Sequence, residues 1–280
     1  MPKTAEKLAF LEQTAREAPE YAEVLTVFQD IFSWMEGKEG ETGIAFEPSL
    51  EHPAERLQGG FPLLTPESLR VDEAKAAAFL VAVVEAMRNA GREADKELLR
   101  LKSLLSDGVL DLPKLFAACL KRERRGVAET AEAVGVPAPI LEFVLESGLK
   151  TALEGFAEGV DRESFAGWKE AYCPVCGSRP GMAELSGEEG KRFLSCSACY
   201  CTWPYSRIKC PYCGNEESDS LTYFEAGDGP TRVDVCLKCT RYIKTRDARK
   251  GHAEVPMEAE DLTTIHLDLL ATREGYERGK

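Results

Sequence analysis

Eight of the ten cysteines form four Cys-x-x-Cys pairs between residues 173 and 239. The pairs are Cys173/Cys176, Cys196/Cys199, Cys210/Cys213 and Cys236/Cys239. Each pair can present two thiolates to one metal ion, and four thiolates fill one tetrahedral site for zinc or iron. A Gly follows the first and third pairs, where it lets the backbone turn sharply after the second sulfur. The spacing therefore predicts two metal ions, each held by four thiolates and by no histidine.

The cysteine-rich stretch also repeats itself. Cys-Pro-Val-Cys-Gly-Ser at 173–178 returns as Cys-Pro-Tyr-Cys-Gly-Asn at 210–215, and a hairpin-like pattern separates the pairs in each half. The simplest arrangement is two tandem ribbons, each closing on its own ion. A cross-braced arrangement, which joins the first pair to the third and the second to the fourth, is compatible with the same spacing. A thioredoxin-type dithiol and disulfides are disfavoured, because such a dithiol lies in a βαβ unit and nothing marks a secreted chain.

Two further cysteines lie outside the four pairs. Cys119 has no neighbour at ligand spacing, so we expect a buried, unreactive thiol in a helix. Cys201 stands two residues after a complete pair, where a fifth thiolate has no place in a tetrahedral site. We expect Cys201 to be a free thiol and the more exposed of the two.

No arrangement of catalytic residues is evident in the sequence. The only histidines are His52, His252 and His266, and there is neither a phosphate-binding loop nor a dinucleotide fingerprint. The sequence therefore predicts a protein that is not an enzyme and has no small-molecule substrate.

The elements that position the cysteines follow from hydrophobic periodicity. Residues 1–165 are predicted to be helical, with an amphipathic helix ending near Met35 and a buried central helix over 74–87, which Gly91 separates from the next helix. A Gly- and Pro-rich stretch at 37–66 predicts an irregular loop, and no strand alternation appears before Met182.

The predicted fold class is α+β, in four parts. A helical domain spans 1–165, a first four-cysteine module of zinc-ribbon type spans 166–206 and a second spans 207–250. A linker and a C-terminal helix occupy 251–280. Residues 244–250 are basic and polar, which favours a linker there as well, whereas apolar residues at 262, 265, 269 and 270 predict the terminal helix over 263–276.

Charge and hydropathy exclude two classes of partner. The net charge is −13; residues 166–250 hold 13 Lys and Arg against 11 Asp and Glu, so this region carries +2 and the remainder −15. So acidic a chain disfavours nucleic acid, which binds through phosphate contacts. The N-terminus has no apolar signal core, and the longest apolar stretch, 76–87, contains Glu85 and is too short to insert into a membrane. We expect a cytoplasmic protein, in which cysteine clusters usually bind metal.

The chain resembles the FdhE family of formate dehydrogenase accessory proteins. The resemblance rests on the four pairs with their flanks and on Trp203, Arg207, Tyr242-Ile243-Lys244, Leu267-Asp268, the ending at 274–278 and the loop Gly-Gly-Phe-Pro-Leu-Leu at 59–64. Cys201 and Pro204 depart from the family pattern, which has Thr or Ser and His there. The resemblance implies a cytoplasmic factor that binds the catalytic subunit of molybdenum- or tungsten-dependent formate dehydrogenase and assists its maturation. It also implies a helical domain followed by two rubredoxin-like modules.

Two functions remain open at this point. One is the accessory factor; the other is a rubredoxin-like electron-transfer protein, since a four-cysteine iron site can change oxidation state whereas zinc cannot. For the first we predict a partner-binding surface at the edge of the second module that includes Arg207, Tyr242 and Lys244, because Arg and Tyr are enriched at interface hot spots. Alternatively, these groups neutralise the thiolate charge or pack beside the second metal site.

Overall fold

A computed structural model describes residues 4–35, 37–48, 53–90, 94–250 and 255–279. The predictions for His52, Gly91 and His252 lie outside the described residues. The chain divides into two compact units, one formed by 11–49 and 64–159 and the other by 1–10, 50–63 and 160–280.

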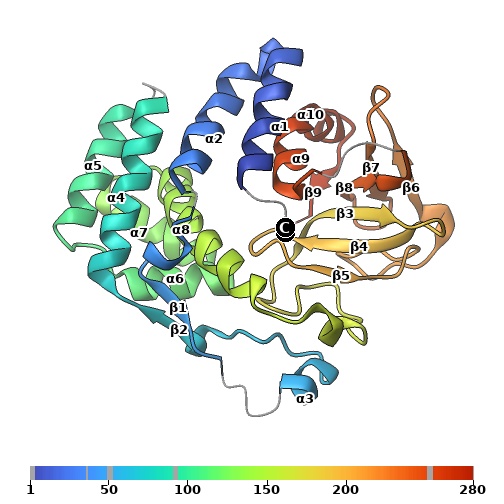
Figure 1. Cartoon of the computed structure of the whole chain (residues 1–280), viewed down its shortest axis with the longest axis horizontal. Coiled ribbons are helices and arrows are strands. Elements are labelled where there is room, and N and C mark those ends of the chain that lie inside the picture. The colour runs from blue at the N-terminus through green and yellow to red at the C-terminus, as the bar shows by residue number, and fades with distance from the viewer. Residues whose placement is uncertain (1–3, 36, 49–52, 91–93, 251–254, 280) are drawn as a thin grey trace. The chain divides into compact units, whose positions relative to one another are not determined.

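The first of these units is helical, as predicted (Figure 1). Its centre is made by α4 (Glu73–Ala90) and α8 (Ala138–Glu158), whose apolar sides include the buried Val84 and Leu145. The other helices are α2 (Ala22–Met35), α5 (Asp95–Ser106), α6 (Leu112–Lys121) and α7 (Arg124–Val134), and α1 (Thr4–Glu17) begins the chain. In the described ranges, no helix combines the length and the apolar character needed to cross a membrane.

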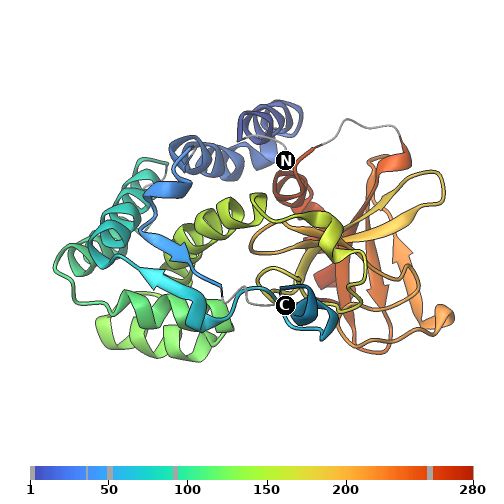
Figure 2. The same ribbon diagram turned by 60° about the horizontal axis from the view of Figure 1, so that its bottom comes forward.

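A short antiparallel pair of strands within the helical unit was not predicted. Strand β1 (Ile44–Phe46) pairs with β2 (Leu69–Val71), and Figure 2 shows the two arrows side by side. A short helix, α3 (Pro53–Gln58), also interrupts the stretch that the sequence predicted to be irregular. Each strand has three residues, too few for a period of two to stand out.

The second unit is built on one sheet of seven strands in the described residues. The strands are β3 (Pro180–Ser186), β4 (Lys191–Cys196), β5 (Thr202–Pro204), β6 (Leu221–Phe224), β7 (Thr231–Cys236), β8 (Arg241–Asp247) and β9 (Glu277–Arg278). Their order is β5-β4-β3-β8-β7-β6 (Figure 1). The two halves of the cysteine-rich region are thus joined edge to edge through the parallel pair β3 and β8. The domain boundaries drawn from the sequence stay a prediction.

The prediction of a linker at 244–250 is wrong, because most of that segment belongs to the central strand β8. Strand β8 pairs with β7 along one edge and with β3 and β9 along the other. Its polar side chains are buried and paired: Arg246 with Glu184 at 3.0 Å (Nε to Oε2), and Thr245 with Asp234 at 2.8 Å (Oγ1 to Oδ2). A buried strand can therefore be polar when distant segments supply its partners.

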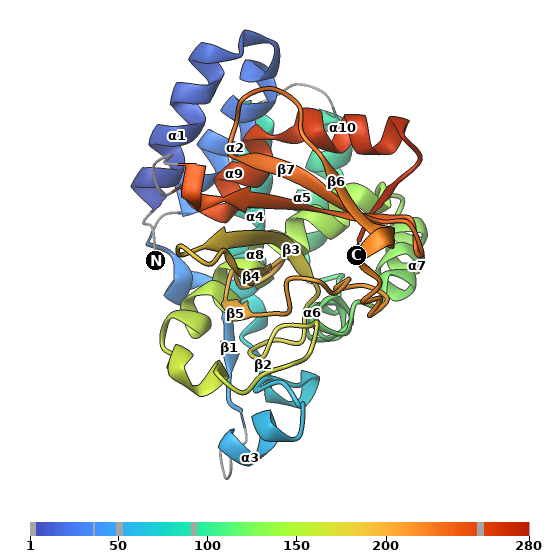
Figure 3. The ribbon, with the colours of Figure 1, turned by 90° about the vertical axis from the view of Figure 1, so that its right-hand side faces the viewer.

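The C-terminal helical region covers one face of the sheet. The structure has two consecutive helices, α9 (Met257–Thr263) and α10 (Ile265–Arg273). Leu267 and Ala271 of α10 pack with Val233, Val235 and Tyr242 in one buried cluster, and Figure 3 shows α10 alongside β7. The predicted terminal helix is confirmed, although Thr264 divides it into two. The apolar face predicted from residues 262, 265, 269 and 270 is wrong, because Leu267 and Ala271 meet the sheet whereas Leu269 is 54% exposed.

Candidate metal centres

The structure brings the eight paired cysteines together as two clusters of four. The first holds Cys173, Cys176, Cys196 and Cys199, and the second holds Cys210, Cys213, Cys236 and Cys239. Within each cluster the four Sγ atoms all lie within 4.8 Å of one another. Of the two arrangements that the sequence allowed, the structure has the tandem one and not the cross-braced one.

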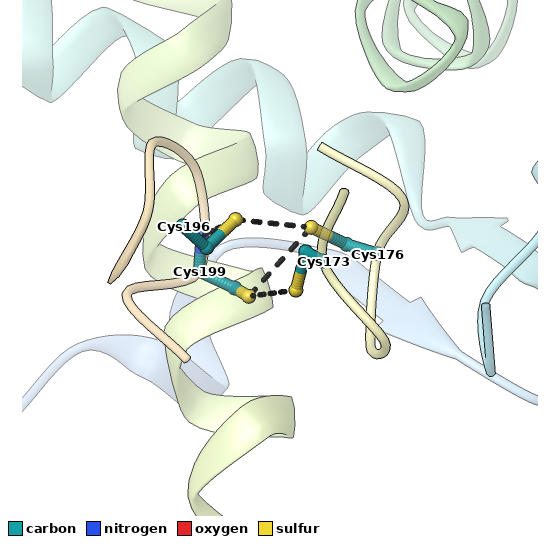
Figure 4. A group of neighbouring side chains, drawn as sticks. All are labelled: Cys173, Cys176, Cys196 and Cys199. Carbon is teal, nitrogen blue, oxygen red and sulfur yellow. Dashed lines mark hydrogen bonds between the residues drawn. The ribbon is translucent and has the colours of Figure 1, made fainter. Parts of the chain in front are cut away.

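The sulfur spacing fits a tetrahedral ion. In the first cluster the Sγ atom of Cys199 lies 3.5 Å from Cys173 Sγ and 3.6 Å from Cys176 Sγ (Figure 4). The Sγ atoms of Cys176 and Cys196 are 3.5 Å apart. In the second cluster two sulfur pairs lie 3.7 Å apart. An ion with metal–sulfur bonds of about 2.3 Å requires sulfurs about 3.8 Å apart. Both clusters could therefore hold a metal ion without a large rearrangement.

The first and third cysteine pairs share one backbone geometry. Cys173 N–H donates to the carbonyl of Ser178 at 2.8 Å, and Cys210 N–H donates to that of Asn215 at 2.8 Å. Gly177 and Gly214 follow the second sulfur of each turn with φ of +71° and +74°. The glycines are therefore placed where a left-handed backbone is needed, as the sequence predicted.

The second and fourth pairs make the same turn without glycine. Tyr200 has φ of +54° and Thr240 has φ of +55°, at the position directly after the second cysteine. For a β-branched residue such as Thr240 this conformation is strained. Tyr200 also makes tertiary contacts: its hydroxyl donates to Glu258 Oε1 at 2.5 Å, and Lys7 Nζ lies 5.2 Å from its ring centroid. The sequence offered no signal for this pair of turns beyond the cysteine spacing.

Polar groups around the sulfurs donate hydrogen bonds to them. The backbone N–H of Ala198 donates to Cys196 Sγ at 3.3 Å, and that of Tyr212 donates to Cys210 Sγ at 3.4 Å. Asn215 Nδ2 lies 3.7 Å from Cys236 Sγ. In the described part of the chain, no Lys or Arg side chain donates to a cluster sulfur.

Burial makes the first cluster costly to charge without a cation. All four of its cysteines are buried, and this burial raises the pKa of Cys173, Cys196 and Cys199 well above the ordinary thiol value. Hydrogen bonds from the neighbouring thiols, Cys173 first, lower the pKa of Cys176. A bound cation would compensate four buried thiolates, so binding is coupled to deprotonation of the cluster.

The second cluster is more open. Cys213 is exposed and Cys239 is partly exposed, whereas Cys210 and Cys236 are buried. Burial of their sulfurs raises the pKa of Cys210 and Cys239 here as well. The same four-thiolate chemistry is thus placed in the interior in one half and at the surface in the other.

The two unpaired cysteines differ from expectation in their exposure. Cys201 is 2% exposed, so the prediction that it is the more exposed thiol is wrong; its main chain continues into β5 and its side chain turns into the module. Cys201 lies outside both clusters, as predicted for a residue that is not a ligand. Cys119 on α6 is partly buried, and burial, with nearby Glu146 and Glu142, raises its pKa to about 12.

The three residues predicted to form a partner-binding surface do not lie together at the surface. Arg207 is exposed. Tyr242 is 2% exposed and Lys244 is 1% exposed, and both contact Asp268: the Tyr242 hydroxyl at 2.7 Å and Lys244 Nζ at 2.6 Å. Because the side chains of Tyr242 and Lys244 are buried, Arg207 is the one residue of the three that a contact surface in this region can include.

An ion cluster around the buried Lys244 of β8 was not predicted from the sequence. Lys244 Nζ lies 2.7 Å from Asp261 Oδ1, and Arg278 Nη2 lies 2.5 Å from the same oxygen. With Asp268 the group holds two cations and two carboxylates, which join β8, α9, α10 and β9. Such a group forms only when segments distant in sequence come together. No local sequence pattern predicts that Lys244 pairs with acidic residues later in the chain.

Comparisons with known proteins agree with this architecture. Residues 172–207 match the family description "FdhE, central domain", and residues 208–280 match "FdhE, C-terminal domain". The chain is 41% identical over 146 residues to a Protein FdhE homolog of Aquifex aeolicus (strain VF5), covering 51% of each protein. It is 34% identical over 155 residues to a Protein FdhE homolog of Pseudomonas putida, covering 51% of this chain and 48% of that one. The chain spans about half the length of the curated relatives it matches.

A solved structure shares the fold over a longer range. The crystal structure of the FdhE protein from Pseudomonas aeruginosa matches with a TM-score of 0.69 and 20% identity, covering 98% of this chain and 93% of that one. At this identity the likeness concerns the fold alone. The family matches, in contrast, include all eight paired cysteines. Residues 172–280, which carry both clusters, thus match the central and C-terminal domains of the FdhE family.

Proposed function

We propose that this protein is a cytoplasmic accessory factor that binds the catalytic subunit of formate dehydrogenase and supports assembly of the active enzyme. The observation that carries the proposal is the family assignment of residues 172–280, the segment that holds both cysteine clusters. The distinctive residues of this segment are eight cysteines in two sets of four potential ligands. A tetrahedral ion held by four thiolates keeps no position for a substrate, which favours a structural or recognition role.

We further propose that the eight paired cysteines ligate two metal ions, either zinc or iron. The donor set is soft sulfur alone, and the spacing of the sulfurs matches the tetrahedral geometry that both metals adopt with thiolates. The ions would fix the hairpin ends of the sheet and supply positive charge to otherwise uncompensated thiolates. We propose a protein as the binding partner, since the acidic chain disfavours nucleic acid.

A second candidate, a rubredoxin-like electron carrier, is favoured by one observation. Cys213 is exposed, so an iron ion in the second cluster would lie near the surface, where electrons can be exchanged with a partner. The metal decides between the candidates. Zinc in both clusters of protein purified from its native host excludes electron transfer, because zinc has no redox chemistry.

The accessory role is tested by deleting the gene in the native host. We expect formate dehydrogenase activity to be lost while its catalytic subunit is still synthesised, and the tagged full-length protein to capture that subunit from extracts. Complementation with the unaltered gene is the control and restores activity. Normal activity in the deletion strain, together with no capture of the subunit, contradicts the proposal.

A further inference from the structure

The sheet of the second module has one covered face and one open face. Along β6, β7 and β8, alternate residues face α10 and form the apolar cluster that includes Val233, Val235 and Tyr242. The residues between them point the other way. By register Tyr223, Asp234 and Ile243 lie side by side across the three strands on this second face.

The open face forms the floor of a groove of about 250 Å³, beside the second cysteine cluster. The loop at 207–212 and Arg192 of β4 make its other wall. Two large apolar side chains at the groove are strongly exposed, Ile208 at 55% and Tyr223 at 53%. Exposed apolar groups of this size, gathered around a concavity, are typical of a surface that a partner covers.

Cations outnumber acids in this groove although the chain as a whole is strongly acidic. Five basic side chains line it, Arg192, Arg207, Lys209, Arg232 and Arg241, against one acidic side chain, Asp234. Asp234 pairs with Arg232 at 2.8 Å, and Lys209 pairs with Glu216 outside the groove at 2.9 Å. Within the described residues, the guanidinium groups of Arg192, Arg207 and Arg241 have no carboxylate partner, so three positive charges stay uncompensated by acidic side chains.

One of these three cations is buried with an unsatisfied donor. Arg192 is 6% exposed, and its Nη1 donates to the carbonyl of Lys209 at 3.0 Å. Its Nε–H has no hydrogen-bond partner among the described residues. A buried guanidinium that lacks a counter-charge and leaves one N–H without an acceptor costs free energy, and a carboxylate bound in the groove would reduce that cost. Within the described residues, no Arg or Lys side chain donates a hydrogen bond to a cluster sulfur.

We propose that this groove binds an acidic peptide segment of a partner protein, with carboxylates on the Arg192, Arg207 and Arg241 side and apolar side chains against Ile208 and Tyr223. The inference rests on the proposed function only for the identity of the partner, which would be the formate dehydrogenase catalytic subunit. Arg207 thus keeps the contact role predicted from the sequence, whereas Arg241, Arg192 and the sheet floor replace Tyr242 and Lys244.

The test uses the metal-loaded full chain and a short fluorescein-labelled peptide in which Glu and Asp alternate with Leu and Phe. Fluorescence anisotropy is measured for the unaltered protein and for the double variant Arg207→Glu/Arg241→Glu. We expect the double variant to bind the peptide at least about tenfold more weakly, since each charge reversal replaces an attraction by a repulsion. The matched control is Arg273→Glu, an exposed cation on α10 at the covered face, which should bind the peptide like the unaltered protein.

Several outcomes overturn the proposal. These are absence of peptide binding, equal affinity in all variants, or equal binding of a peptide with Lys in place of Glu and Asp. Displacement by inorganic phosphate, but not by chloride at equal ionic strength, would indicate a small-anion site, and tighter binding of a thymidine oligonucleotide would indicate a nucleic-acid site. Metal content and Tm of each variant are measured alongside, and if the double variant loses either, single reversals and Arg207→Gln/Arg241→Gln replace it.

The proposed function and the groove fail separately. Capture of the catalytic subunit by the unaltered protein, with no binding of the acidic peptide and no loss of capture in the double variant, leaves the proposed function and rejects the groove. Charge-dependent peptide binding without capture of the catalytic subunit keeps the groove and rejects the proposed partner.

Discussion

The two cysteine clusters have the same ligands, the same spacing within each Cys-x-x-Cys pair and similar backbone turns, but they differ in burial. In the first, all four sulfurs are buried, and Tyr200 ties the second turn to α9 through Glu258. In the second, Cys213 is exposed, Thr240 follows its last cysteine without a tertiary contact of that kind, and an open cationic groove adjoins it. The same four-cysteine arrangement thus occurs once in the interior and once at a position that solvent reaches.

Replacement of one ligand in each cluster should separate the two roles most strongly. We expect Cys173→Ser to lose one ion per chain and about 5 kcal/mol of stability, a fall in Tm of about 10 °C or more, because three buried thiols then remain without a cation. Cys213→Ser should cost less, since water can reach the vacated position. Metal analysis and thermal unfolding of both variants measure this. Equal losses of stability would remove the distinction between the clusters.

The packing between Gly279 and Tyr212 should not tolerate extra volume. A Cβ added at Gly279 would lie 1.9 Å from Cζ of Tyr212, whose hydroxyl donates to the carbonyl of Pro180 at 3.3 Å. We expect Gly279→Ala to destabilise the protein by about 2 kcal/mol, or about 5 °C in Tm. Gly229→Ala is the matched control, because nothing lies within 4 Å of a Cβ there. An unchanged Tm in Gly279→Ala would show that the chain after β9 does not pack tightly against Tyr212.

Metal release should follow the exposure of the sulfurs. With a chelator in excess, we expect the second cluster to lose its ion at least about tenfold faster than the first cluster. The first cluster must open locally before a competing ligand can enter. Release is followed with a chromogenic chelator in the unaltered protein, where two phases are expected. Only the slow phase should remain in a Cys213→Ser/Cys236→Ser variant. A single phase in the unaltered protein would contradict the comparison.

The smallest effect concerns the two left-handed residues without glycine. Thr240→Gly should stabilise the protein by about 0.5–1 kcal/mol, because it relieves a strained backbone at an exposed position. Tyr200→Gly relieves similar strain but removes the hydrogen bond to Glu258, so we expect a net loss of about 1 kcal/mol. Chemical denaturation of the metal-loaded variants measures both free energies. The same sign in both would mean that the Tyr200 contacts contribute nothing.

Much of the metal chemistry could be predicted from the sequence because it is local. Two thiolates in one Cys-x-x-Cys turn are neighbours whatever the rest of the chain does, and Gly177 and Gly214 mark the left-handed position directly after them. Helical periodicity likewise placed α2, α4 and the C-terminal helix, since a helix's apolar side repeats every three to four residues. These features depend on residues only a few positions apart.

What the tertiary structure alone decided involves partners far apart in sequence. Strand β8 looked like a linker because its polar and charged side chains pair with Glu184, Asp234 and Asp268, which no local pattern connects to it. The tandem pairing of the clusters, the burial of Cys201 and Tyr242, and the gathering of five cations around one groove follow from the tertiary arrangement of strands and loops. The spacing of the cysteines determined which atoms could bind metal. The tertiary structure determined which of those atoms are exposed, because exposure is set by the segments that pack over a residue.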